Sequence, residues 1–238
     1  MPRGYTSAAI RAIERAHLDA GEPLMQRAAA ALADELRALL DGRPADRRIL
    51  LLAGGGDNGG DALYAGAALA ADGARVELLR TSPRIHEGGL AAALAAGVDV
   101  AGIGVDDDAE AASDAAERAA SADLVVDGLV GLGASGPLRG RTRAVVLAVA
   151  GALDASPASE RPLVVAVDLP SGLDADTGTV GRGEDGRSAV LPADVTVTML
   201  AMKAGFLREP GRSLAGRVLV ADLGLAADFD ALPPDSLA

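Results

Sequence analysis

The sequence predicts an α/β domain of the Rossmann-like type: a three-layer, doubly wound, mostly parallel sheet with helices on both faces. Strand-like and helix-like segments alternate from residue 48 to residue 224, which is typical of parallel βαβ units. The strand-like segments are continuous apolar runs, as expected of strands that are covered on both faces. Because no Pro- or Ser-rich stretch divides the 238 residues, we expect a single domain over 1–238, with N-terminal helices (1–42), an α/β core (48–224) and a tail (225–238).

Two amphipathic helices are expected before the sheet. Thr6 or Ser7 can cap a first helix that ends near Gly21. Pro23 suits the first turn of a second helix, which stops at Asp41–Gly42.

The core then alternates between the two kinds of element. Expected strands cover the apolar runs at 50–55, 74–80, 98–104, 122–128, 162–169, 194–200 and 216–224. Expected helices lie between them, at 59–73, 88–97, 106–121 and 141–155. The carboxyl ends of parallel strands meet at one edge of the sheet, where such sheets bind their ligands.

Composition argues against several classes of function. The chain has 34 acidic and 22 basic residues, a net charge of −12 and only 2% aromatic residues, so we expect no nucleic-acid partner. It has no Cys and two scattered His, which leaves no basis for a thiolate or zinc site. It shows neither a secretory signal nor an apolar stretch long enough to span a bilayer, so we expect no membrane partner and a cytoplasmic location.

The first predicted strand ends in a glycine-rich loop, residues 53–63. Gly54, Gly56 and Gly59 satisfy G-x-G-x-x-G, but Asp57 and Asp61 bring negative charge to a place where a dinucleotide phosphate would lie. One reading is a turn in which Asp57 or the following Asn is the helix N-cap. The other is a loop that admits a ligand and binds a cation or a hydroxyl through its Asn and Asp side chains.

Two further strand ends carry an acid. Asp127 precedes a loop with four glycines, which indicates either close approach of the backbone to a ligand or a flexible loop. Asp168 ends the most apolar strand and is followed by a Pro170-Ser171-Gly172 turn. Burial would raise the pKa of such a carboxyl toward that of a useful general acid or base, although a simple capping role is the alternative.

All three segments, and three weaker ones, match motifs of one known family. GGGDNGGDAL (54–63), DLVVDGLVGLGASGPLRG (123–140) and VVAVDLPSGLDADTG (164–178) carry the match, and GEPLMQRAAAA (21–31), ADVTVTMLAMKAGFL (193–207) and VLVADLG (218–224) extend it. They resemble the motifs of the NAD(P)H-hydrate epimerases, also called YjeF N-terminal domains. The three main family motifs read G-N-G-N-N-G-G-D-G-L, D-L-I-V-D-A-L-F-G-T-G-L-S-R-P-L-x-G and V-A-V-D-I-P-S-G-L-D-A-D-T-G.

The resemblance implies an isomerase that interconverts the R and S epimers of hydrated NAD(P)H, NAD(P)HX, in nicotinamide nucleotide repair. A dehydratase that uses ATP or ADP would then restore the S form to NAD(P)H. Because no dehydratase sequence is present here, we expect that enzyme to be a separate protein. Family members often form dimers, so the resemblance is compatible with a homodimer.

The resemblance also implies roles for the matching residues. Asp168 would contact the hydrated ring, and we expect it to be the catalytic residue, shuttling a proton while the hydroxyl leaves or the ring opens. Potassium is the expected cofactor, with Asn58, Asp127 and Ser171 as ligands. The substrate contacts would be Asp57, Asn58, Gly59, Gly60 and Asp61 at the nucleotide, and Gly131, Leu132, Gly133, Ala134, Ser135, Gly136 and Pro137 at its phosphates. We expect Asp168→Asn to fold normally and to lose epimerisation.

Some positions depart from the family pattern. Asp57 replaces an Asn, Leu132 a Thr and Gly136 an Arg, so phosphate binding is the least secure part of the resemblance. Lys203, the only lysine in the chain, matches a family lysine, but a surface or packing role is equally compatible with the sequence.

Two other functions compete with this one. An NADP-dependent oxidoreductase could use the same G-x-G-x-x-G with Arg80 near the end of the second strand, although this leaves the other two loops without a role. A non-catalytic nucleotide-binding or scaffold member of the same fold would fit the altered loop at 132–136.

Overall fold

The computed structural model describes residues 3–101, 107–133 and 136–233. These residues form a seven-stranded sheet of order β3-β2-β1-β4-β5-β6-β7, and all its pairs are parallel. The strands are β1 (Arg48–Ala53), β2 (Arg75–Arg80), β3 (Asp99–Ala101), β4 (Leu124–Gly128), β5 (Leu163–Val167), β6 (Val195–Met199) and β7 (Arg217–Ala221). The strand order reverses between β1 and β4, which confirms the doubly wound arrangement.

The sheet is buried on both faces because successive side chains of each strand point to opposite sides. In β1, Ile49 and Leu51 belong to one hydrophobic cluster and Leu50 and Leu52 to another. All four are 0–1% exposed. A continuous apolar run in the sequence therefore supplies two cores at once.

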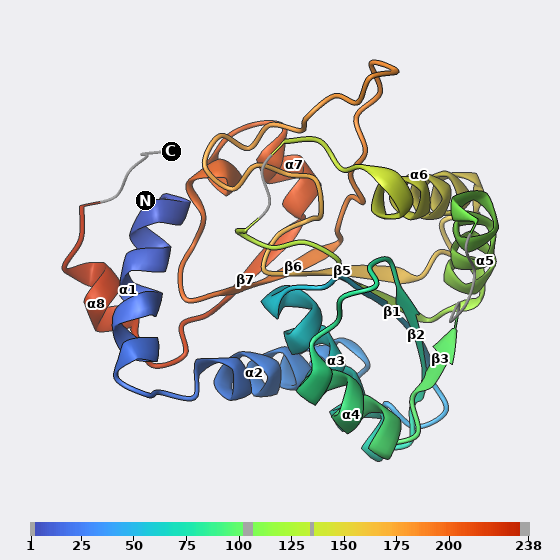
Figure 1. Cartoon of the computed structure of the whole chain (residues 1–238), viewed down its shortest axis with the longest axis horizontal. Coiled ribbons are helices and arrows are strands. Elements are labelled where there is room, and N and C mark those ends of the chain that lie inside the picture. Colours follow the sequence, from blue (N-terminus) through green and yellow to red (C-terminus); the bar gives the residue numbers. More distant parts are fainter. Residues whose placement is uncertain (1–2, 102–106, 134–135, 234–238) are drawn as a thin grey trace.

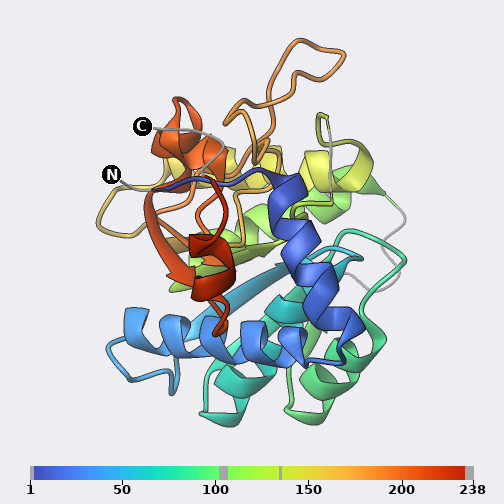
Figure 2. The same cartoon turned by 90° about the vertical axis from the view of Figure 1, so that its left-hand side faces the viewer.

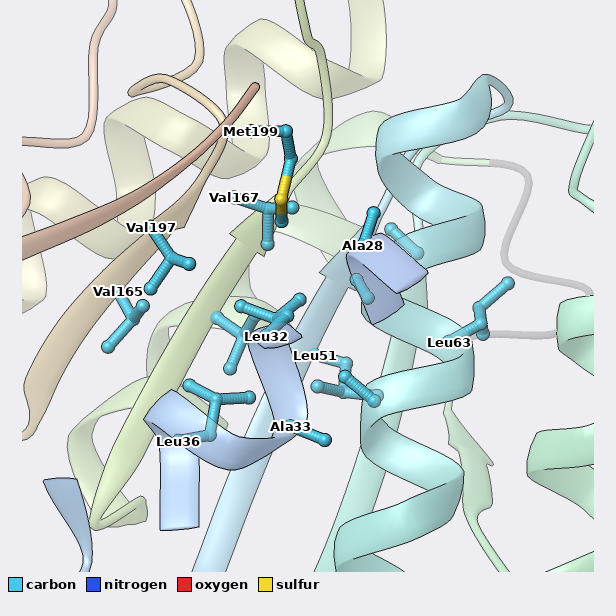
Figure 3. Close-up of a cluster of buried hydrophobic side chains, with 14 of the residues drawn as sticks. Ala28, Leu32, Ala33, Leu36, Leu51, Leu63, Val165, Val167, Val197 and Met199 are labelled. Atoms are coloured by element: carbon cyan, nitrogen blue, oxygen red, sulfur yellow. The ribbon is translucent and has the colours of Figure 1, made fainter. Parts of the chain in front are cut away.

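Helices cover the two faces in separate layers (Figure 1). One layer contains α2 (Leu24–Leu39), α3 (Asp57–Ala71) and α4 (Glu87–Ala95), and the other α5 (Asp108–Ser121) and α6 (Gly140–Ala155). Figure 3 shows Leu32 and Leu36 of α2 lying over Val165 of β5 and Leu51 of β1. On the other face, alanines of α5 and valines of α6 pack against β1, β4 and β5.

The two ends of the chain lie together beside the sheet. Helix α1 (Ser7–Asp19) and the short α8 (Ala226–Asp230) occupy the same side of the molecule (Figure 2). The Tyr5 hydroxyl donates to the Phe229 carbonyl at 2.8 Å, and the two rings meet edge to face at 5.4 Å. Phe229 is buried, so the segment expected to be a tail is in part a packed helix.

Most predicted elements are present, with differences at their ends. Thr6 caps α1 by accepting a hydrogen bond from the Ala9 backbone N–H, as expected. The N-cap of α3 is Gly56, so neither Asp57 nor the following Asn caps that helix. The strand expected at 98–104 is described only as β3, because residues 102–106 lie outside the described ranges. The sequence did not lead us to expect the 3-10 helix η1 (Ala204–Leu207) or the short α7 (Gly211–Ala215).

Every helix in the described part of the chain is too short or too polar to cross a bilayer.

Candidate functional site

A cavity of about 680 Å³ lies at the carboxyl ends of the central strands. Its walls include residues that directly follow β1, β4 and β5 and the last residue of β6, together with side chains of α1 and α2. The position is the one expected for ligands of an open parallel sheet, beside the reversal of strand order. The volume is that of a small-molecule site.

The cavity brings together many of the residues that the sequence singled out. Asp57, Asn58, Asp61, Gly131, Leu132, Gly133 and Asp168 all line it. Gly59 and Gly60 are buried in the first turns of α3 and do not line it, and Gly136 lines a separate pocket of about 110 Å³. Pro137 is half-buried and lines neither of these two pockets, while Ala134 and Ser135 lie outside the described residues.

Two glycines of the first loop serve the fold itself. A Cβ on Gly54 would lie 1.8 Å from the Leu129 carbonyl oxygen, and one on Gly59 would lie 2.3 Å from the Gly54 carbonyl oxygen. Neither distance is sterically allowed, so these positions require glycine whether or not a ligand is present. The fold alone therefore accounts for glycine at these two positions, and the interpretation of the loop as one that admits a ligand does not depend on them.

Asp168 is held in a fixed position by three donors. Its backbone adopts φ 66°, a left-handed conformation that an Asp tolerates better than most residues. The Met199 backbone N–H donates to Asp168 Oδ1 at 3.0 Å, and the Thr198 hydroxyl donates at 3.3 Å. The third donor is the ammonium group of Lys203.

Lys203 is a buried member of the site. Its side chain is fully buried, lines the cavity, forms an ion pair with Asp168 and donates to the Met199 carbonyl at 2.8 Å. A buried ammonium needs such partners because water is absent. The surface role that the sequence left open for Lys203 is therefore wrong. The available signal was that it is the only lysine in the chain.

Asp127 and Ser171 lie behind the cavity wall, and both are fully buried. The Ser171 hydroxyl and backbone N–H donate to the Asp127 carboxylate at 2.6 and 2.8 Å, and the Leu129 N–H donates at 3.3 Å. Asp127 forms no ion pair with any residue that the structure describes. Burial raises the pKa of this carboxyl, and the Ser171 hydrogen bonds oppose that rise.

Asn58 is connected to the same cluster through Val130. The Val130 N–H donates to Ser171 Oγ at 3.1 Å, and Asn58 Nδ2 donates to the Val130 carbonyl at 3.2 Å and to the Val167 carbonyl at 2.8 Å. The neighbourhood thus offers a carboxylate, a hydroxyl, an amide and backbone carbonyls. These are hard oxygen donors of the kind that alkali and alkaline-earth cations prefer. A buried carboxylate without a cationic partner would be stabilised by a bound cation, so the residues fit such an ion.

Asp61, in the second turn of α3, is buried in the wall of the cavity and has no counter-charge among the described residues. It is 7% exposed, and its Oδ1 receives no hydrogen bond from the described residues. Burial and the neighbouring carboxylates of Asp168, Asp57 and Glu14 raise the pKa of Asp61 to about 8. Burial and the carboxylates of Asp168 and Asp57 likewise raise the pKa of Glu14, which lies on α1.

Three cations also line the cavity. Lys203 lies in its wall, and the exposed Arg11 and Arg15 lie on α1. The Arg11 guanidinium donates to the Leu132 carbonyl and so connects α1 to the loop after β4. The cavity is therefore lined by both carboxyl groups and cations. The described residues contain no group of three Asp, Glu or His side chains arranged to hold a metal.

The two histidines and Arg80 take no part in the cavity. His86 caps α4 by accepting from the Gly89 N–H at 2.9 Å, and His17 pairs with Glu22 and Asp228. Arg80 donates to the Pro83 carbonyl at 3.0 Å.

A doubly wound parallel sheet with a cavity at its switch point, lined by both apolar and charged side chains, defines an α/β protein of the Rossmann-like class. Residues 21–205 match the model of the family described as YjeF-related protein N-terminus, and the chain belongs to that family.

Curated relatives include an NAD(P)H-hydrate epimerase from Clavibacter michiganensis, 48% identical over 93% of this chain and 90% of that protein. An NAD(P)H-hydrate epimerase from Microbacterium testaceum is 45% identical over 93% of this chain and 78% of that protein. The bifunctional NAD(P)H-hydrate repair enzyme Nnr of Mycobacterium tuberculosis is 38% identical over 93% of this chain and 41% of that protein. The crystal structure of yeast ynu0 (YNL200c) superposes with a TM-score of 0.70 over 99% of this chain and 96% of the yeast chain. Because the sequences are only 18% identical, this similarity supports the fold alone.

Proposed function

We propose that this protein is an NAD(P)H-hydrate epimerase, an isomerase that interconverts the R and S forms of NAD(P)HX in nicotinamide nucleotide repair. The observation that carries the proposal is the Asp168–Lys203 pair, which holds a carboxylate in the wall of a cavity of small-molecule size. Relatives that bear the epimerase name at 45–48% identity support the same activity.

The chemistry requires a proton donor and a proton acceptor. The hydrated ring is a hemiaminal, in which one carbon bears a hydroxyl and is bonded to the ring nitrogen. Inverting that carbon means breaking its bond to oxygen or to nitrogen and forming it again on the other face. Asp168 is fixed by its three donors, so its free Oδ2 can accept a proton at one place during this exchange.

Potassium is the cation we propose for the Asn58–Asp127–Ser171 cluster. Asp127 is buried without a counter-charge from the described residues, and the side chains of the cluster offer oxygen atoms as ligands. A bound potassium ion would supply positive charge behind the loop that follows β4. In this proposal Asp127 and Ser171 hold the ion and do not touch the substrate, since neither lines the cavity.

Coupling to an ATP- or ADP-dependent dehydratase is also part of the proposal. The M. tuberculosis relative, of which this chain matches 41%, is named a bifunctional repair enzyme. We infer that a dehydratase consumes the S epimer that this chain forms.

The direct test uses purified R-NADHX, with the two epimers separated by chromatography over time. We expect the protein to accelerate equilibration and to do so more in potassium chloride than in choline chloride. Equilibration at the spontaneous rate in both salts would contradict the enzymatic function and favour a non-catalytic nucleotide-binding or scaffold role. Tight binding of ordinary NADP with hydride transfer would instead favour an oxidoreductase, for which Arg80 outside the cavity gives no support.

A further inference from the structure

We propose that Asp61 is a second catalytic residue of this site, the proton donor that works together with Asp168. The proposal rests on the epimerase function and concerns which group supplies the proton. It starts from a difference between two carboxyl groups that line one cavity: Asp168 is paired with an ammonium group, whereas Asp61 Oδ1 has no hydrogen-bond partner among the described residues.

The burial of Asp61 is the first step of the argument. The side chain lies on α3, whose glycine-rich first turn packs against the loops after β1 and β4. Its Oδ1 is inaccessible to solvent and receives no hydrogen bond from the residues described. An ionised carboxylate in such a place would lose its hydration without gaining a hydrogen bond at Oδ1. A protonated carboxyl is less costly to bury, and it can donate a hydrogen bond to a ligand.

The charges around Asp61 also favour its protonated form. Asp57 on the same helix, Asp168 at the end of β5 and Glu14 on α1 all oppose a further negative charge. The cations of the cavity are engaged elsewhere or lie on its rim: Lys203 is bonded to Asp168 and Met199, and Arg11 to Leu132, while Arg15 is exposed. With its pKa raised to about 8, Asp61 carries its proton at neutral pH.

Two carboxyl groups in contrasting environments are a recurrent solution for acid–base catalysis. Asp61 donates its proton to the hydroxyl of the hydrated ring, the C–O bond breaks, and the hydroxyl leaves as water. The lone pair of the ring nitrogen forms the C=N bond of an iminium ion. Water then adds to the other face of that carbon, its proton passes to Asp168, and the C=N electrons return to nitrogen. Exchange with solvent after release moves the proton from Asp168 back to Asp61, so the reaction is balanced.

The test compares native protein with Asp61→Asn, which keeps the size of the side chain and removes the acid. We expect kcat for R-NADHX to fall by about 10²–10⁴-fold, the usual contribution of a general acid, with little change in KM. We expect kcat of the native protein to decline as the pH rises through about 8, and the residual activity of the variant to lack that decline. Asp61→Glu, which restores an acid, should recover part of the activity.

Asp154→Asn is the matched control, because Asp154 is exposed on α6 at the opposite face of the sheet. It should keep the native kcat and the native pH profile. Circular dichroism and thermal unfolding of each variant establish that it is folded before its kinetics are interpreted.

The outcomes separate the two proposals. A native protein that accelerates epimerisation, together with an Asp61→Asn variant that keeps native kcat and the same decline near pH 8, would overturn the role of Asp61 alone. A folded native protein with no activity would overturn the epimerase function and the role of Asp61 with it.

Discussion

Asp127 is the penultimate residue of β4 and Asp168 directly follows the neighbouring β5; both are buried, yet the fold stabilises them in opposite ways. Asp168 is paired with the ammonium group of Lys203, so its charge is balanced within the protein. Asp127 receives one hydroxyl and two backbone N–H groups and no protein cation in the described ranges. The difference is that the charge of Asp168 is balanced by a side chain of the protein, whereas Asp127 is stabilised by hydrogen bonds alone among the described residues. Asp61 is a third case, in which the carboxyl keeps its proton.

The largest effect is expected from breaking the ion pair. Lys203→Met leaves the Asp168 carboxylate buried without a cation, and Asp168→Asn leaves the Lys203 ammonium buried without an anion. Each change should lower the free energy of unfolding by about 3–5 kcal/mol, as measured by urea denaturation at pH 7. The expectation from sequence that Asp168→Asn folds normally is revised by this contact.

The double variant Asp168→Asn/Lys203→Met is the control for that experiment. It removes both charges, so it should be more stable than the sum of the two single effects predicts. Single variants within about 0.5 kcal/mol of the native protein would show that the pair contributes no net stability.

A smaller loss of stability is expected from changes at Asp127, because this carboxylate is stabilised by hydrogen bonds and not by an ion pair with a described residue. Asp127→Asn turns an amide NH₂ toward donors that need an acceptor, and should lower the free energy of unfolding by about 2–3 kcal/mol. Ser171→Ala removes one hydroxyl and should cost about 1–2 kcal/mol. Equal stability of Asp127→Asn and the native protein in urea denaturation would mean that these hydrogen bonds contribute nothing.

Asp61 should respond to pH in the direction opposite to a salt-bridged carboxylate. Its pKa is raised on folding, so the folded state binds more protons than the unfolded state between about pH 4 and pH 8. The contribution of Asp61 to the free energy of unfolding therefore falls across that interval as the pH rises, and it is lost above about pH 8. Asp61→Asn should gain about 1–2 kcal/mol over the native protein at pH 8.5 compared with pH 7.

Thermal unfolding of both proteins at several pH values measures this difference in stability. Each kcal/mol shifts the Tm by about 2–4 °C for a domain of this size. Asp154→Asn should follow the native curve at each pH. A constant difference between Asp61→Asn and the native protein from pH 5 to pH 8.5 would contradict a neutral Asp61.

The smallest effect is expected from potassium. An ion that binds only the folded state raises stability by about 1.4 kcal/mol at ten times its Kd. The Tm of the native protein should be higher in potassium chloride than in choline chloride of equal concentration, and Asp127→Asn should lose that difference. An equal potassium effect in both proteins would place the ion elsewhere.

The fold could be predicted from the sequence because both of its signals are local. Continuous apolar strands alternating with helices define a parallel sheet, and the acids at the strand ends then fall on one edge. Residues 204–207 and 211–215 were not predicted, because short helical turns of this kind depend on contacts between distant segments.

The sequence predicted which acidic residues would lie near one another, but not which of them would be paired with a cation. Asp57, Asn58, Asp61 and Asp168 reach the cavity as expected. That Asp168 pairs with Lys203 depends on burial and on a contact across 35 residues, neither of which a motif specifies. The lack of a partner for Asp61 is likewise a property of the packed structure.

The backbone of Tyr5 is bonded on both sides of Lys203. The Tyr5 N–H donates to the Met202 carbonyl, and the Ala204 N–H donates to the Tyr5 carbonyl, each at 2.9 Å. The segment around Tyr5 therefore makes these contacts only after residues near 204 and 229 have been synthesised. During synthesis the wall of the cavity that carries Lys203 would be assembled after the strands that precede it, so a nascent chain would lack an ordered site until residues near 229 had been made.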